Sequence, residues 1–164
     1  MNSQDKILVV GAGNILLADE GFGIIALSEL RKKITSDDVV MFDAGTDIYK
    51  IMNLDDRFQK IIVLDAVKQK QQAGTIYRLP LHKIEIESDA KSSHQIKVIE
   101  ALKLMQVTID NLKDCEIIIM GVEPAKIEYC VGLSKEVERA LVYFVDLVLE
   151  EIENARSIVS QEYN

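Results

Sequence analysis

Residues 11–23 read Gly-Ala-Gly-Asn-Ile-Leu-Leu-Ala-Asp-Glu-Gly-Phe-Gly, and this stretch decides the fold because it follows the apolar run Ile7-Leu8-Val9-Val10. An apolar run before a glycine-rich turn is typical of the first strand and loop of an α/β domain. In a dinucleotide-binding loop the glycines lead directly into a helix, whereas here Asp19 and Glu20 come first. Two carboxylates repel a phosphate, so we expect this loop to face a metal ion or a proton.

Apolar runs alternate with helical patterns along the rest of the chain, which favours a largely parallel sheet covered by helices. The expected strands are residues 6–11, 38–43, 60–66, 74–79 and 115–121, and the expected helices are 20–33, 47–54, 94–106 and 135–153. The fourth strand alternates in polarity and follows the third after a loop too short for a helical crossover, so we expect it to be antiparallel. The prediction is an α/β fold in three αβα layers, with a twisted, mostly parallel five-stranded sheet and one antiparallel edge strand.

The chain of 164 residues has the length of one domain, residues 1–164, and we expect residues 153–164 to fray. A net charge of −8 disfavours nucleic acids and anionic membranes as partners, because both bind basic surfaces. No apolar stretch approaches the ~20 residues of a membrane span, and the first residues lack a signal-peptide pattern, so we expect a cytoplasmic protein. Cys115 and Cys130 have no metal-type spacing and are predicted to be reduced, mostly buried thiols.

Polar side chains gather where the predicted strands end, which is where open α/β sheets bind ligands. In chain order they are Asn14, Asp19 and Glu20, then Asp43, Gly45 and Thr46, then Asp65, His94 and Glu123. Two carboxylates and an imidazole from this set would form a three-ligand site with open positions, suited to Ni²⁺ or Zn²⁺. Each acid also has a structural alternative: Asp19 as the cap of the next helix, Glu20 as a first-turn acid, and Asp43 or Asp65 as a turn residue.

His94 lies beside Ser92-x-x-Gln95, a capping-box pattern that places the histidine in the first turn of a helix. The positive end of the helix dipole disfavours an imidazolium there, so we expect a neutral ring that is able to bind a metal. The alternative is a histidine at the surface or one already hydrogen-bonded. His82 lies in a polar loop and is expected at the surface.

The stretch Gly13-Asn-Ile-Leu-Leu-Ala-Asp-Glu-Gly-x-Gly23 resembles the N-terminal signature of the [NiFe]-hydrogenase maturation endopeptidases. Four later segments are similar to that family's motifs and occur in the same order: Asp43-Ala-Gly45-Thr46, Asp65-Ala66, Ser93-His94-Gln95, and Gly121-Val-x-Pro124 followed by Gly132-Leu133. The resemblance runs from about residue 7 to residue 150. It is specific because all the motifs are in register.

The resemblance implies a hydrolase, an endopeptidase that removes a C-terminal extension from the large-subunit precursor of a [NiFe]-hydrogenase. It implies that Glu20, Asp65 and His94 bind nickel carried by the precursor, and either carboxylate could be the catalytic general base. Family members are grouped with aspartic-type proteases, although this chain has no paired Asp-Thr-Gly repeat. The expected partner is the nickel-loaded precursor, and we expect a monomer that uses no nucleotide. We expect substrate-binding or supporting roles for Asn14, Asp19, Asp43, Gly45 and Thr46.

Two other functions stay open on the sequence alone. A nucleotide- or dinucleotide-binding module would place phosphates at Gly11-Ala-Gly13 and a ribose at Asp43, but Leu16 stands where the third glycine belongs. A non-catalytic homologue would check whether nickel is bound without cutting its partner.

Overall fold

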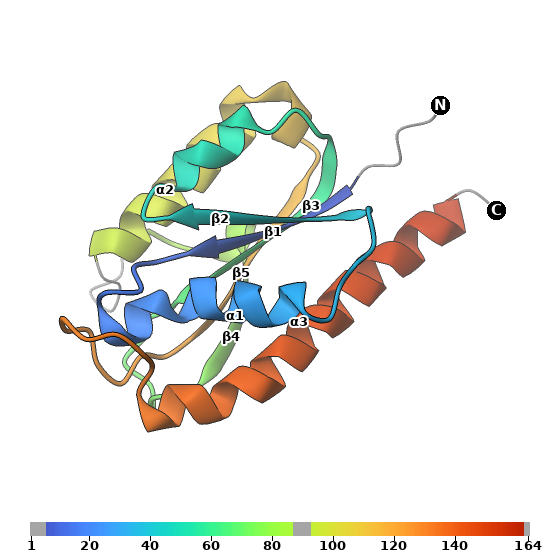
Figure 1. The fold of residues 1–164 in the computed structure, drawn as a ribbon. Helices are drawn as coiled ribbons and strands as arrows, with labels where there is room; N and C mark the ends of the chain where they lie inside the picture. Colours follow the sequence, from blue (N-terminus) through green and yellow to red (C-terminus); the bar gives the residue numbers. More distant parts are fainter. Residues whose placement is uncertain (1–5, 87–92, 163–164) are drawn as a thin grey trace.

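The computed structural model describes residues 6–86 and 93–162, and these residues contain one five-stranded sheet (Figure 1). Its strands are β1 (Lys6–Ala12), β2 (Val39–Gly45), β3 (Phe58–Ala66), β4 (Ile76–Pro80) and β5 (Glu116–Val122). They lie in the order β2-β1-β3-β5-β4, and only β4 runs antiparallel to its neighbour. The predicted fold class is therefore confirmed, including the antiparallel edge strand.

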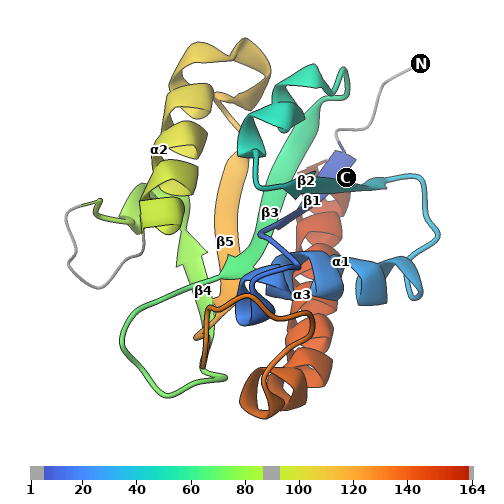
Figure 2. The same ribbon diagram turned by 60° about the vertical axis from the view of Figure 1, so that its left-hand side comes forward.

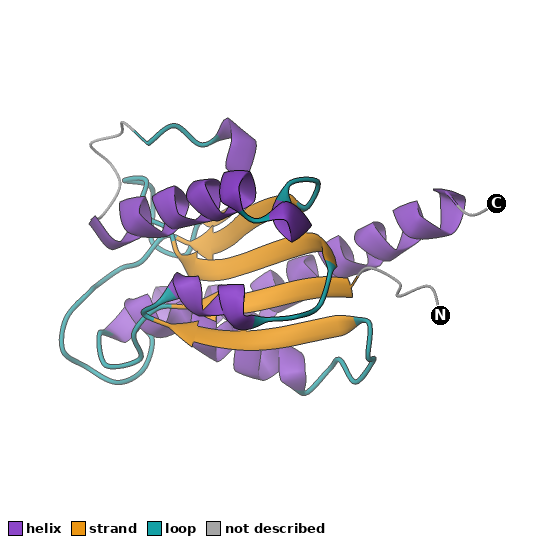
Figure 3. Ribbon diagram, turned by 90° about the horizontal axis from the view of Figure 1, so that it is seen from above, coloured by secondary structure: helices purple, strands orange, loops and turns teal. Residues whose placement is uncertain are grey.

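The helices form two layers, one on each side of the sheet (Figure 3). They are α1 (Phe22–Arg31), α2 (Ser93–Thr108) and α3 (Lys135–Glu162), with short 3₁₀ helices η1 (Ala18–Gly21), η2 (Ile48–Asn53), η3 (Leu81–Lys83) and η4 (Asp110–Leu112). Helices α1 and α3 cover one face, and α2 covers the other with η2. None of the helices in the described ranges has the length and apolar character of a membrane span.

Two helix predictions need correction. The helix expected over residues 20–33 is divided into the 3₁₀ turn η1, which begins at Ala18, and α1, which begins at Phe22 and ends at Arg31. The fraying expected from residue 153 is wrong as far as residue 162, since α3 continues to that point. The helix continues because Ile152 and Ala155 still pack into the core. Residues 163–164 lie outside the described ranges.

The sheet is apolar on both faces because its inner strands alternate between two cores. In β1, Leu8 and Val10 pack towards α2, whereas Ile7 and Val9 pack towards α1 and α3. The strands β3 and β5 alternate in the same way. Burial on both faces explains why these strands are continuous apolar runs in the sequence.

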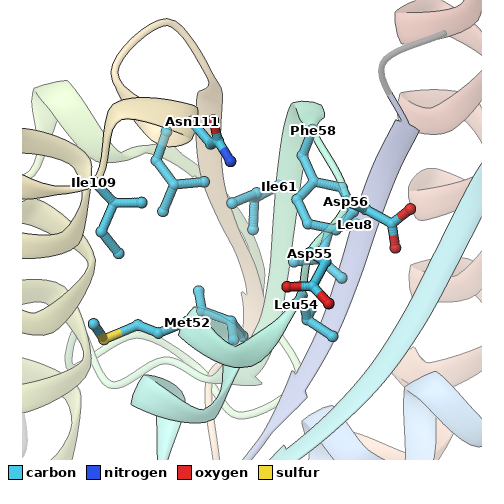
Figure 4. A pocket seen from close by; sticks show the side chains of 11 residues that line it. Leu8, Met52, Leu54, Asp55, Asp56, Phe58, Ile61, Ile109 and Asn111 are labelled. Atoms are coloured by element: carbon cyan, nitrogen blue, oxygen red, sulfur yellow. The ribbon is translucent and has the colours of Figure 1, made fainter. Parts of the chain in front are cut away.

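A cavity of about 230 Å³ lies at the amino ends of the parallel strands, between η2 and η4 (Figure 4). Leu8 at the start of β1 and Phe58 at the start of β3 form part of its apolar wall, and Asp55 and Asp56 also line it. Ligands of open α/β sheets bind beyond the carboxyl ends of the strands. The cavity is thus at the opposite end of the sheet from the predicted site.

Candidate active site

The predicted site lies where the chain connections of the sheet diverge. From β1 the chain passes through α1 to β2 on one side, whereas from β3 it continues to β4 and β5 on the other. Such a switch point opens a crevice beyond the strand ends. Glu20 enters it from η1 after β1, Asp65 from the end of β3, and His94 from the first turn of α2.

Asp65 and His94 face one another in this crevice. The Asp65 side chain is buried, and its Oδ1 accepts a hydrogen bond of 2.8 Å from the amide of Ala66. Its Oδ2 lies 3.6 Å from Nε2 of His94. That nitrogen is buried, and among residues 6–86 and 93–162 it has no hydrogen-bond partner; its contact with Asp65 is an ion pair only when the ring is protonated. Because buried polar atoms are nearly always paired, an unpaired imidazole nitrogen beside a carboxylate marks a place for a ligand.

Glu20 is coupled electrostatically to both residues. Burial raises the pKa of the Glu20 carboxyl, the charge of His94 lowers it, and the charge of Asp65 raises it. For His94, the adjacent Asp65 is the main cause of a raised pKa; burial opposes this effect, and the charge of Glu20 adds to it. The prediction of a neutral His94 considered only the helix dipole, which opposes this rise in the pKa, and the charge of the ring stays a prediction. Ser92 lies outside the described residues, so the capping box stays a prediction.

The backbone of Glu20 is fixed from two sides. Its amide donates to the carbonyl of Leu17 over 3.2 Å, and its carbonyl accepts a hydrogen bond of 3.1 Å from the amide of Asn14. Gly13, at φ 132°, makes this close approach possible, because a Cβ there would lie 1.9 Å from the Glu20 carbonyl oxygen. Gly23 has a similar role, since a Cβ on it would lie 2.1 Å from the carbonyl oxygen of Leu64. These glycines permit tight packing rather than phosphate binding.

The chemistry of this set suits a borderline divalent metal. Asp65 and His94 supply a carboxylate and an imidazole side by side, and Glu20 lies within electrostatic reach of both. Over residues 6–86 and 93–162, however, no three acidic, histidine or cysteine side chains are already grouped to hold one metal ion. The crevice therefore offers a pair of adjacent donors and a third acid close by, rather than a preformed three-ligand cage.

Asp19 has a different role from the helix cap considered for it. Gly21 occupies the N-cap of α1, and no side chain caps that helix. The Asp19 carboxylate is fully buried and accepts four hydrogen bonds of 2.7–3.0 Å, from the amides of Ala125 and Lys126 and from the amide and hydroxyl of Ser134. It thereby fastens the loop before α3 to the loop after β1. Sequence reasoning missed this role because the partners are more than 100 residues away.

The remaining predicted residues shape the loops at the strand ends. Oδ1 of Asn14 accepts from the amide of Leu16 (3.0 Å), and Oδ1 of Asp43 accepts from the amide of Gly45 (2.9 Å). The carbonyl of Gly45 accepts from the amide of Gly13 (2.8 Å), which joins the ends of β1 and β2. Thr46 is exposed beside them. Contact of these residues with a substrate stays a prediction.

Two further polar residues support the segment after β3. The buried carboxylate of Glu123 accepts hydrogen bonds from the amide of Gln69 (2.8 Å) and the hydroxyl of Tyr77 (2.6 Å). Oε1 of the buried Gln95 accepts from the amide of Lys68 (3.1 Å). The sequence shows Glu123 as an acid at the end of a strand, but it does not predict which groups donate hydrogen bonds to it. Gln95 links the chain just after Asp65 to the helical turn that carries His94.

The chain is also similar in sequence to known proteins. The family model described as hydrogenase maturation protease matches residues 24–151, which is more than half of the chain. The chain belongs to the hydrogenase maturation protease family. It is 32% identical over 158 residues to a putative hydrogenase maturation protease of Methanocaldococcus jannaschii, covering 93% of this chain and 99% of that relative. It is 29% identical over 147 residues to the hydrogenase 2 maturation protease of Escherichia coli, covering 88% of each chain.

Solved structures show the same similarity. The [NiFe] hydrogenase maturation protease HybD from Thermococcus kodakarensis superposes with a TM-score of 0.77 at 25% identity, covering 90% of this chain and 99% of that one. The hydrogenase maturating endopeptidase HybD from Escherichia coli gives 0.76 at 26% identity, covering 92% and 93%. The expected resemblance is thereby confirmed, and this hydrogenase maturation protease is a hydrolase of peptide bonds. A dinucleotide-binding function is not supported, because α1 begins only at Phe22 and the amide of Gly13 already donates to the carbonyl of Gly45.

Proposed function

We propose that this protease removes a C-terminal extension from the large-subunit precursor of a [NiFe]-hydrogenase, and that Glu20, Asp65 and His94 recognise nickel already bound to that precursor. Family membership supports the substrate class. The observation that carries nickel recognition is the buried, unpaired Nε2 of His94 beside Oδ2 of Asp65. The proposal includes the expected monomeric state and cytoplasmic location.

Nickel that arrives with the substrate agrees with the arrangement of the donors. A resident metal would usually need at least three grouped ligands, and no such group is present among the described residues. A metal held partly by the precursor needs only a few additional donors, and imidazole and carboxylate are suitable ones. Binding would also relieve the repulsion between the negative charges of Glu20 and Asp65. A precursor without nickel would gain none of this stabilisation.

Glu20 is the better placed of the two carboxylates to act as general base. One oxygen of Asp65 accepts the amide of Ala66 and the other lies 3.6 Å from Nε2 of His94, so both oxygens of this carboxylate lie next to other groups of the protein. Glu20 is only partly buried, and its raised pKa brings it nearer to neutrality, where general bases are most effective. Glu20 would then take a proton from the attacking water while Asp65 and His94 hold the metal. The metal would polarise the scissile carbonyl.

The test is incubation with a nickel-loaded large-subunit precursor, followed by mass spectrometry of the released peptide. We expect the wild-type protein to release the extension, and Glu20→Gln, Asp65→Asn and His94→Ala each to slow release by about 100-fold or more. His82→Ala is the matched control and should cleave as the wild type does, because His82 is exposed on η3, which follows the end of β4 that pairs with the first half of β5. Release at the wild-type rate by His94→Ala would show that the site is wrongly assigned.

Nickel recognition is tested separately with the same precursor prepared without nickel. We expect the wild-type protein to leave it intact. Equal cleavage of both precursors would disprove metal-dependent recognition while leaving the protease activity in place. Binding of the loaded precursor without release of any peptide would instead identify a non-catalytic nickel-checking homologue.

A further inference from the structure

Large apolar side chains are exposed on the two loops beside the candidate site. We call the five of them the apolar rim: Ile15, Leu16, Ile127, Tyr129 and Val131, with exposed fractions of 49%, 55%, 41%, 91% and 76%. Single exposed apolar residues are common, but a contiguous group usually marks an interaction surface. The question is whether these residues form one surface and what covers it.

Backbone hydrogen bonds join the two loops into one surface. The amide of Cys130 donates to the carbonyl of Leu16 over 3.0 Å, and the amide of Ala18 donates to the carbonyl of Cys130 over 2.7 Å. Leu17 and Cys130 thus form a parallel β-bridge. Figure 2 shows the orange loop before α3 lying beside the blue segment that leads into α1. Cys130 itself is exposed, so the prediction of two mostly buried thiols is correct only for Cys115.

The rim is continuous with the candidate catalytic groups. Leu17 follows the rim residues Ile15 and Leu16, and its carbonyl accepts the amide hydrogen of Glu20. Asp19, directly before Glu20, holds the other loop through its four buried hydrogen bonds. A partner lying on the rim would therefore lie against the loop whose backbone holds Glu20. This continuity points to the substrate of the protease rather than to an unrelated protein.

The bridge also leaves hydrogen-bonding groups open on the far side of the loop. Cys130 directs both its amide and its carbonyl towards residues 16–18. The amides of its neighbours Tyr129 and Val131 have no partner within the described parts of the chain. Main-chain donors next to exposed apolar side chains suit an extended peptide, because such peptides bind through backbone hydrogen bonds and alternate side chains.

We propose that the apolar rim is the docking surface for the substrate protein, and that it holds an extended apolar segment of the substrate close to the scissile bond. The inference rests on the proposed function, since the occupant is the hydrogenase precursor itself. The rim adds affinity for the protein part of the substrate, whereas Asp65 and His94 respond to its metal. The two kinds of recognition are therefore separable by mutation.

The experiment measures kcat and KM for the nickel-loaded precursor with a Tyr129→Ser/Val131→Ser double variant. We expect KM to rise by about tenfold or more while kcat stays within about twofold, because the rim contributes to binding and not to the chemical step. Both side chains are exposed, so thermal unfolding should match that of the wild type. Tyr129→Phe keeps the apolar ring and should retain the wild-type KM.

The matched control is a Val142→Ser/Tyr143→Ser double variant, whose residues are 72% and 63% exposed on α3. It removes a similar exposed apolar area away from the rim and should leave KM unchanged. An unchanged KM in the rim variant, or an equal rise in the control, would overturn the docking inference while cleavage itself stands. Absence of cleavage by the wild-type protein would instead overturn the proposed function, and the docking inference with it.

Discussion

Glu20 keeps its position because the residue opposite its carbonyl has no side chain. Gly13 lies where a Cβ would approach the Glu20 oxygen to 1.9 Å, and its φ of 132° is one that other residues rarely adopt. The sequence shows the glycine but not its purpose, because a nucleotide loop and a tightly packed loop contain the same residue. The difference emerges only from the atom that the missing side chain would meet.

Gly13→Ala should be both destabilising and inactivating. The strained φ and the collision with Glu20 together should lower the free energy of unfolding by about 3 kcal/mol or more, and displacement of Glu20 should slow peptide release. Urea denaturation and the cleavage assay measure the two effects. Gly132→Ala is the control, since its φ is 102° but a Cβ there meets nothing within 4 Å. The free energy of unfolding of Gly132→Ala should fall only by the cost of the strained φ, about 1–2 kcal/mol. An equal fall in Gly13→Ala would show that the contact with Glu20 is unimportant.

Helix α3 is tied to the sheet by charges as well as by apolar packing. Glu151, which is buried, receives two hydrogen bonds of 2.8 Å from the guanidinium of Arg78 on β4. Its carboxylate also lies 2.5 Å from Nζ of the buried Lys60 on β3. One side chain of the helix thus connects two strands. The helical pattern in the sequence predicted a helix over residues 135–153, but the ion pairs depend on strand order and could not be predicted from that pattern.

Glu151 should make stability depend on pH in the acid range. Arg78 is the main cause that lowers the pKa of Glu151 from 4.5 to about 2, and Lys60 lowers it further while burial opposes both. The ionised Glu151 carboxylate stabilises the fold fully above pH ~4.5, and this stabilisation is lost as the pH falls to about 2. Glu151→Gln should therefore lose about 2–3 kcal/mol at neutral pH and show a flatter decline in acid.

Denaturation curves collected between pH 2 and pH 7 measure this difference. Glu150→Gln is the control on the same helix, because Glu150 is exposed, and its curve should follow that of the wild type. Parallel pH curves for Glu151→Gln and the wild type would contradict the assignment of the acid-sensitive step to Glu151.

Across the whole molecule, the sequence predicted what depends on strand ends and periodicity. Parallel strands end at one edge of the sheet, so Glu20 and Asp65 could be placed together before any coordinates were known. His94 joined this set because it follows the fourth strand at the start of the next helix, whereas the choice of Glu20 and Asp65 among the acids required the family resemblance. The role of Asp19 was not predictable, because its partner Ser134 lies 115 residues away. Local patterns carry no information about such a pairing.

Asp19→Asn tests this long-range connection. The Asn amide keeps the shape of the Asp19 carboxylate. In either orientation, however, its NH₂ group replaces an oxygen that accepted a hydrogen bond, so it faces a backbone or hydroxyl donor. We expect the free energy of unfolding to fall by about 2–4 kcal/mol and the loop of residues 125–133 to become sensitive to limited proteolysis. Asp43→Asn is the control, because the exposed Asp43 makes a local turn contact and no other side-chain hydrogen bond in the described part of the chain, so stability should change by about 0.5 kcal/mol or less. Similar losses in both variants would contradict the anchoring role of Asp19.

The Asp19–Ser134 connection also has a consequence for the time at which the protease becomes competent during synthesis. A nascent chain emerges from its N-terminus, so the acidic loop leaves the ribosome more than 100 residues before Ala125, Lys126 and Ser134. Until they arrive, the Asp19 carboxylate lacks every donor that holds it. The segment that carries Glu20 can therefore settle only after residue 134 has emerged, which keeps a shorter nascent chain from acting on its substrate.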